Sequence, residues 1–166
     1  MWSGKIIALA LSLTLTACFT PLYGVKSDGT SAQSQMKNVE IATIGGRVGI
    51  LMRNELIYGF SGTGEEAQNP IYRLHVTHSF AGSLLVVDTQ AGRPESESTT
   101  LNATYRLTEI KSGKEIFKGV AFASASLDTS QQRYARDRGR LDAQNRASKV
   151  VSDQITTHIA TFFATR

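Results

Sequence analysis

The stretch Thr104–Gly119, TYRLTEIKSGKEIFKG, decides the fold. Its first half continues an alternation of apolar and polar residues over 99–110, which is typical of a strand with one buried face. Lys111–Lys114 predicts a tight turn in which Gly113 supplies the positive φ. Glu115–Ser126 then returns as a second strand. We therefore predict a β-hairpin. The first strand alternates through Leu101, Ala103, Tyr105 and Leu107, and the second contains Ile116, Val120 and Phe122.

Upstream of this hairpin the pattern predicts a strand at Lys37–Ile44, a helix at Arg47–Phe60, a strand at Ile71–Phe80 and a short strand at Leu84–Val87. The polar stretches Lys26–Gln35 and Thr89–Glu97 are predicted to be a linker and an exposed loop. The apolar positions of the helix are Val48, Leu51, Met52, Leu56 and Phe60.

The C-terminal part of the chain predicts a long amphipathic helix. Thr129 and Gln132 have capping-box spacing, and Gly139 weakens the first turns, so the firm start is expected near Arg140. The buried stripe is expected to hold Ala143, Ala147, Val151, Ile155, Ile159 and Phe163, broadened by Val150 and Phe162. The predicted class is α+β, in the order β-α-β-β-β-α. Two helices then pack on one face of a mostly antiparallel sheet of four strands, or five if 84–87 is separate.

The N-terminus predicts an export signal. Lys5 precedes the ten-residue apolar run Ile6–Leu15, which is too short for a bilayer span of about 20 residues and suits a signal peptide. Leu15-Thr16-Ala17-Cys18 resembles the bacterial lipobox, which makes Cys18 the lipidation site. Phe19, rather than Asp, favours the outer membrane by similarity to known lipoprotein sorting. An ordinary secreted protein with a free cysteine is the alternative.

This signal divides the 166 residues into three parts: a lipoprotein signal peptide at 1–17, a lipidated tether at 18–36 and a single domain at 37–166. Cys18 is the only cysteine, so the chain forms no internal disulfide. The formal charge of +4 is mildly basic, and the export signal argues against nucleic acid as a partner.

Four segments resemble one family: CFTPLYG at Cys18–Gly24, PIYRLHV at Pro70–Val76, the hairpin Thr104–Gly119, and the tail from Tyr134-Ala135 to QITTHIATFF. They are similar to the LPS-assembly lipoprotein LptE family in its alphaproteobacterial form. The family typically has Gly after the lipidated Cys, and this chain lacks it. The resemblance implies two helices on a four-stranded sheet, and a non-catalytic plug inside the LptD β-barrel. Such a protein helps the barrel assemble and helps place lipopolysaccharide (LPS) in the outer leaflet. It is lipid-anchored on the periplasmic side of the outer membrane.

Basic residues supply candidate contacts to LPS phosphates, because arginine pairs with phosphate through a planar fork. One group lies in the long helix, where six basic and two acidic residues occur over 133–149, and another lies at strand ends and turns. The alternatives are a solvated helix face, or a face that meets the acidic lumen of a barrel. The candidates are Arg93, Arg106, Lys111, Lys114, Lys118, Arg136 and Arg140.

No catalytic set, metal site or cofactor site is expected. His75 and His78 are three apart in a strand, so their side chains point to opposite faces. The glycines from Gly59 to Gly64 follow a helix, which does not fit a nucleotide-binding loop. Glu95 and Glu97 are expected to be solvated. Besides the barrel plug, a stand-alone periplasmic ligand-binding or envelope lipoprotein of similar α+β fold stays open.

Overall fold

The computed structural model describes Gly24 and residues 30–88, 93–128 and 132–166. The elements follow one another as α2 (Ala32–Met36), β1 (Val39–Ile41), α3 (Gly46–Ser61), β2 (Tyr72–Asp88), β3 (Arg93–Glu109), β4 (Glu115–Asp128) and α4 (Arg133–Thr165). The strands form one sheet in the order β1-β2-β3-β4. β1 is parallel to β2, and the other pairs are antiparallel. The predicted α+β class is confirmed.

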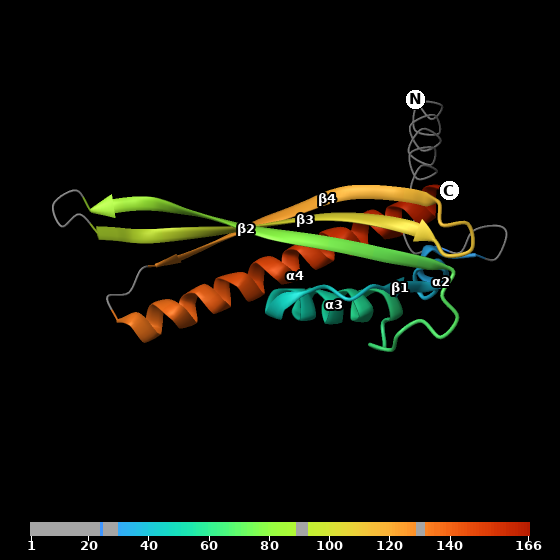
Figure 1. Cartoon of the computed structure of the whole chain (residues 1–166), viewed down its shortest axis with the longest axis horizontal. Helices are drawn as coiled ribbons and strands as arrows, with labels where there is room; N and C mark the ends of the chain where they lie inside the picture. The colour runs from blue at the N-terminus through green and yellow to red at the C-terminus, as the bar shows by residue number, and fades with distance from the viewer. Residues whose placement is uncertain (1–23, 25–29, 89–92, 129–131) are drawn as a thin grey trace, which may run out of the picture.

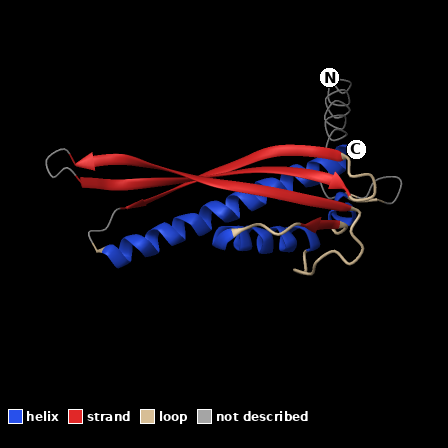
Figure 2. Ribbon diagram, in the orientation of Figure 1, coloured by secondary structure: helices blue, strands red, loops and turns tan. Residues whose placement is uncertain are grey.

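The molecule has two layers, a long twisted sheet above and the helices below (Figures 1 and 2). The six-residue stripe predicted for α4 is buried in full, whereas Val150 is 46% exposed and does not belong to it. Val150 lies about 100° round the helix from the buried Val151, which turns it to solvent. α3 lies beside α4, where Arg47 donates to Gln144 and Asn145. Within the described residues, the other face of the sheet carries no helix (Figure 2).

β4 faces the helices with its small residues, a choice that the sequence pattern left undecided. Its buried positions are Ala121, Ala123, Ala125 and Leu127, whereas Val120 and Phe122 are 60% and 63% exposed. The reason is the close approach of α4. Gln154 of α4 accepts a hydrogen bond from the Phe122 N–H at 3.2 Å, and a Cβ at Gly139 would lie 3.5 Å from Leu127. Small side chains on β4 permit this approach.

The buried Tyr105 connects three elements. Its ring extends from β3 across β4 at Gly119, where a Cβ atom would overlap the phenol. The phenol oxygen then lies 2.6 Å from Nδ1 of His158 on α4. Burial raises the pKa of Tyr105 from 10.0 to about 12. His158 is thus a structural partner of the core.

The domain begins earlier than predicted. Residues 32–36, assigned to the tether, form α2, and Ala32 and Met36 are buried in the core. Ser31 caps this helix by accepting a hydrogen bond from the Ser34 N–H at 3.0 Å, and the Ser34 hydroxyl accepts one from the Ser31 N–H. The polar composition concealed the helix because its two buried positions are separated by polar residues.

Three other boundaries also differ. α4 begins at Arg133 rather than near Arg140, because Gly139 lies against Leu127 and gains packing there. The two predicted strands at 71–80 and 84–87 are one strand, β2, whose register shifts after Leu84. Residues 93–97, predicted as loop, open β3. The signal peptide, Cys18, residues 89–92 and Thr129 with its predicted capping box lie outside the described residues. No helix in the described ranges is long and apolar enough to cross a membrane.

Candidate functional site

The open face of the sheet brings three basic side chains into one row. The register opposes His75 of β2 to Arg106 of β3, and Arg106 to Lys118 of β4. Directly opposed residues on one face of antiparallel strands have Cβ atoms about 5 Å apart. These three residues, which we call the basic row, therefore form one continuous strip across the sheet. Arg106 and Lys118 were predicted candidates, whereas His75 was not.

A hollow with a volume of about 430 Å³ lies over the basic row. Ala42 and Thr43, which follow β1, form one wall, and Glu115 contributes from the start of β4. Thr77 and Thr104 continue the floor beside the basic row. The hollow thus offers hydroxyls, cations and one carboxylate to a ligand.

The charge in this hollow is positive on balance. Lys118 Nζ lies 3.9 Å from the Glu115 carboxylate, and both side chains are exposed, so this pair is weak. Among the residues that the structure describes, Arg106 makes no salt bridge. An unpaired guanidinium on an open surface is suited to a phosphate or carboxylate group, which it can bind through two parallel hydrogen bonds.

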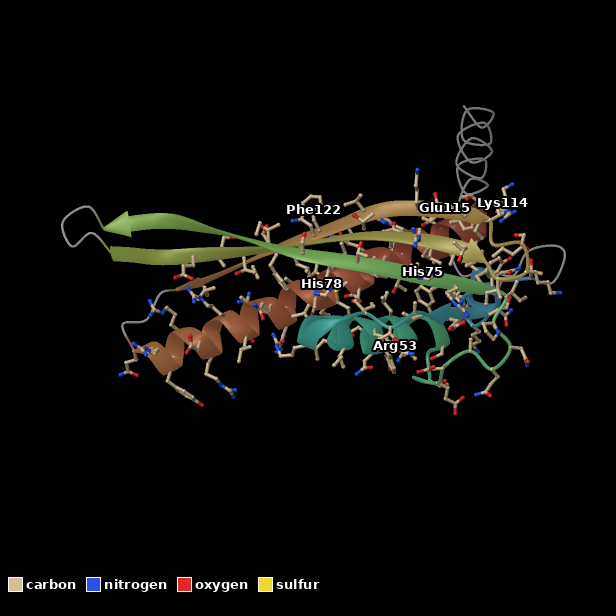
Figure 3. All side chains as sticks on the ribbon, in the orientation of Figure 1. Arg53, His75, His78, Lys114, Glu115 and Phe122 are labelled. Atoms are coloured by element: carbon tan, nitrogen blue, oxygen red, sulfur yellow. The ribbon has the colours of Figure 1, made fainter. Side chains whose placement is uncertain are left out.

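Val120 and Phe122 form an apolar pair next to the basic row. They are two residues apart on β4, and both project from the open face in register with Thr104 and Asn102. Figure 3 shows Phe122 on the side of the sheet away from the helices. Large exposed apolar side chains that adjoin one another mark interaction surfaces more often than isolated ones do.

β4 is also an edge strand, and α4 covers part of that edge. Besides the bond from the Phe122 N–H to Gln154, Arg146 donates to the Ser126 carbonyl at 3.1 Å. Side chains that bond to edge groups reduce uncontrolled strand pairing. A partner at β4 is therefore expected to contact the outward side chains rather than the strand edge.

The other predicted candidates lie elsewhere. Lys111 and Lys114 occupy the β3–β4 turn at one end of the molecule, and Figure 3 shows Lys114 there. Arg136 and Arg140 lie in the first turns of α4, toward the opposite end (Figure 1). Arg93 opens β3, but its side chain is outside those that the structure describes. The seven candidates thus fall into separate groups.

Arg140 already forms a salt bridge with an acidic residue, Glu97. Its Nε and Nη2 lie 3.0 and 2.8 Å from one oxygen of the Glu97 carboxylate, and the Glu97 side chain is 13% exposed. The prediction that Glu97 is a solvated loop residue is wrong, because β3 begins at Arg93 and turns Glu97 toward α4. This arrangement favours a structural role for Arg140 over contact with a ligand phosphate.

The apolar pair was not predicted as part of a site, because the sequence pattern assigned Val120 and Phe122 to a strand without deciding which face of it is exposed. The signal was present in the alternating alanines at 121, 123 and 125, which mark the face of β4 that a helix can approach closely. The histidine prediction agrees with the register: His75 opposes Arg106, whereas His78 opposes the buried Ala103 and packs edge-on to Phe80. Over residues 30–88, 93–128 and 132–166, no three His, Cys, Asp or Glu side chains are grouped to hold a metal.

Known proteins match this chain in fold. A candidate lipoprotein from Caulobacter crescentus CB15 superposes with a TM-score of 0.67 at 23% identity, over 81% of this chain and 97% of that one. A minor lipoprotein from Acinetobacter baumannii has a TM-score of 0.60 at 15% identity, over 76% and 92%. Rare lipoprotein B from Shewanella oneidensis has a TM-score of 0.58 at 12% identity, over 75% and 94%. Neither a protein-family model nor a curated protein matches the sequence. The chain thus shares the α+β fold of these bacterial proteins.

Proposed function

We propose that this chain is an outer-membrane lipoprotein of the LptE type, a non-catalytic plug of an LptD-like β-barrel that assists LPS transport and barrel assembly. The observation that carries the proposal is the open sheet face, where the exposed pair Val120 and Phe122 adjoins the basic row. The lipobox that ends at Cys18 and the four family-like segments support it. The shared fold with structures named as lipoproteins agrees with it.

In this proposal Cys18 supplies the attachment to the membrane. A diacylglyceryl group on its thiol and an acyl group on its amine together exceed the two chains that stable anchoring requires. The domain then stands on the periplasmic side of the outer membrane. The apolar pair would pack against the barrel wall or an acyl chain, and Arg106 and Lys118 would meet LPS phosphates. The whole activity consists of binding and positioning.

The hollow over the basic row favours a second candidate function. A volume of about 430 Å³ is within the size range of small-molecule sites. A stand-alone periplasmic lipoprotein that binds a small anionic ligand would use the same cations without a barrel. This candidate predicts ligand binding by the purified chain, and it predicts recovery of the chain alone from membranes.

The deciding experiment is capture of the tagged lipoprotein from membranes in mild detergent, followed by identification of its partners. We expect a large outer-membrane β-barrel to co-purify with the unchanged chain. The double variant Val120→Ser/Phe122→Ser should lose the barrel and keep its fold, because both side chains are exposed. Recovery of the unchanged chain without any barrel would favour the second candidate function.

The helix layer offers a matched control for this experiment. Ile50 and Tyr58 of α3 are 59% and 63% exposed, close to the values for Val120 and Phe122. Ile50→Ser/Tyr58→Ser therefore removes a similar exposed apolar area from the opposite layer. If both double variants lose the barrel equally, the open face is not the specific contact.

A further inference from the structure

Three connections meet at the end of the molecule where α4 terminates (Figure 1). They are Lys37-Asn38 after α2, Pro70-Ile71 before β2, and the turn Ile110–Lys114 between β3 and β4. Backbone hydrogen bonds join them: the Ile71 N–H donates to Asn38 O at 2.8 Å, and the Ile110 N–H donates to Ile71 O at 2.9 Å. We call Ile71 together with Ile110–Lys114 the end loops.

The end loops expose an apolar pair of their own. Ile71 is 42% and Ile110 37% exposed, and their backbones are directly hydrogen-bonded. Both residues lie outside the paired part of the sheet, so they are separate from Val120 and Phe122 on the open face. Lys111 and Lys114 follow in the same exposed turn. Isoleucines flanked by lysines match a bilayer interface, where the apolar groups enter the lipid and the ammonium groups stay at the phosphates.

The charge of the end loops themselves is +2, since residues 110–114 hold two lysines and no acid. Acidic groups border this turn. Glu109 accepts a hydrogen bond from the Ser112 hydroxyl, and Glu115 faces Lys118. Lys37 shares a small hollow with Glu40, Glu65 and Glu66, so we do not count it as available. The positive charge is therefore concentrated at the tip of the turn.

The chain leads back to the anchor from this same end. α2 lies here, beside the C-terminus of α4 (Figure 1), and its N-cap is Ser31. Twelve residues lie between Cys18 and Ser31, and the thirteen Cα–Cα steps span at most about 45 Å at full extension. A short connection thus holds the end loops, rather than the arginine-rich start of α4, closest to a lipidated Cys18.

From these observations we infer that the end loops dock on the anionic phospholipid surface of the membrane that holds the anchor. Lys111 and Lys114 contact headgroup phosphates, and Ile71 and Ile110 enter the interface between them. The inference rests on the lipid anchor of the proposed function, but not on its barrel or on LPS. Docking fixes the long axis of the domain relative to the bilayer, which the anchor alone does not do.

A fluorescent probe at Ser112 tests the docking. In the mature lipoprotein the thiol of Cys18 carries lipid, so Ser112→Cys provides the free thiol for an environment-sensitive dye. The lipidated chain is reconstituted into phosphatidylethanolamine vesicles that contain phosphatidylglycerol, or into neutral phosphatidylcholine vesicles, each with a quencher on the lipid headgroup. We expect quenching and a blue shift in the anionic vesicles, with a smaller effect in the neutral ones. A probe at Ser124→Cys, which is exposed on β4, should report water in both.

Two double variants of the probe-carrying chain separate the contributions. Lys111→Glu/Lys114→Glu should abolish the difference between anionic and neutral vesicles, and Ile71→Ser/Ile110→Ser should abolish the blue shift. Ile50→Ser serves as the control and should change neither. Equal signals from the Ser112 and Ser124 probes, or no effect of charge reversal, overturn the inference.

The same preparations distinguish this inference from the proposed function. If the chain docks on vesicles but captures no barrel, the docking inference is supported and the proposed plug function is rejected. If the chain captures a barrel but does not dock on vesicles, the plug function is supported and the docking inference is rejected. An unmodified Cys18, measured by the mass of the N-terminal peptide, overturns both.

Discussion

Tyr105 of β3 and His158 of α4 are joined by a 2.6 Å hydrogen bond that passes over Gly119 of β4. The ring occupies the space in which any other residue at position 119 would place its Cβ atom. The sheet and the long helix are thereby fixed at one point, below the strip of the open face that carries Arg106 and Lys118. The geometry of the candidate site consequently depends on a glycine that no ligand touches.

Gly119→Ala should destabilise the fold by about 1–3 kcal/mol, the usual cost of overpacking a filled core. The new methyl group would displace the Tyr105 ring and its bond to His158. Urea unfolding followed by circular dichroism measures the change. Gly82→Ala is the matched control, because Gly82 also lies in a strand and a Cβ there would be 3.9 Å from the Ser98 carbonyl oxygen, an ordinary van der Waals distance. A Gly119→Ala protein as stable as the control would contradict the observed path of the ring.

Tyr105→Phe should cost about 0.5–1.5 kcal/mol by removing one buried hydrogen bond. His158→Ala should cost a similar amount, and the double variant should cost less than the sum of the two, because the residues share one interaction. A double-mutant cycle in urea measures the coupling. Strictly additive effects would show that the bond does not stabilise the fold.

The same tyrosine predicts a loss of stability at alkaline pH. The pKa of Tyr105 is raised from 10.0 to about 12 in the folded state, because burial disfavours the charged phenolate. The stability that this group contributes is therefore complete below pH 10 and is lost as the pH rises toward 12. Thermal unfolding between pH 9 and 12 should show a steeper decline for the unchanged chain than for Tyr105→Phe. Parallel profiles of the two proteins would count against the assignment.

Arg140→Met should destabilise the domain by about 1–2 kcal/mol, because it leaves the Glu97 carboxylate, 13% exposed, without its cation. Lys149→Met breaks a pair with Glu55 in which the side chains are 64% and 40% exposed, and it should change stability by less than about 0.5 kcal/mol. Thermal melts of the two variants provide the comparison. Equal losses of stability in the two variants would show that the burial of Glu97 does not strengthen its ion pair with Arg140.

Arg106→Glu/Lys118→Glu should weaken binding of LPS about tenfold or more. Each cation near an anionic lipid surface contributes about 1 kcal/mol, and about 1.4 kcal/mol corresponds to a factor of ten. Binding of the unchanged chain should also weaken as salt is raised. Arg138→Glu/Lys149→Glu, which also reverses two exposed charges but on the helix layer, is the control for charge alone. An equal loss in that control would assign the effect to net charge instead of the open face.

Local periodicity accounts for the parts of the fold that the sequence predicted. The β3–β4 hairpin, α3 and the buried stripe of α4 are confirmed, because alternation and i+4 spacing are properties of adjacent residues. The face that β4 turns inward was not predictable in this way. The larger apolar side chains Val120 and Phe122 point outward and the small Ala121, Ala123 and Ala125 point inward, because the choice depends on how closely α4 approaches.

The candidate site was predicted only in part for a related reason. Residue type identified Arg106 and Lys118 as possible phosphate ligands, but the sequence gives no distance between residues on different strands. Strand register decided that His75 joins them in one row, and the fold decided that Arg140 is paired with Glu97. Val120 and Phe122 belong to the candidate site because β4 directs their side chains to the open face of the sheet.

The sequence by itself determined the class of the fold, the order of its main elements and the resemblance of Leu15–Cys18 to a lipobox, because each is written in neighbouring residues. Tertiary structure alone decided which side chains are free to meet a partner. A charge or an aromatic ring is available only when no other segment covers it. The segment that covers it is distant along the chain: Arg140 is 43 residues from Glu97, and His158 is 53 residues from Tyr105.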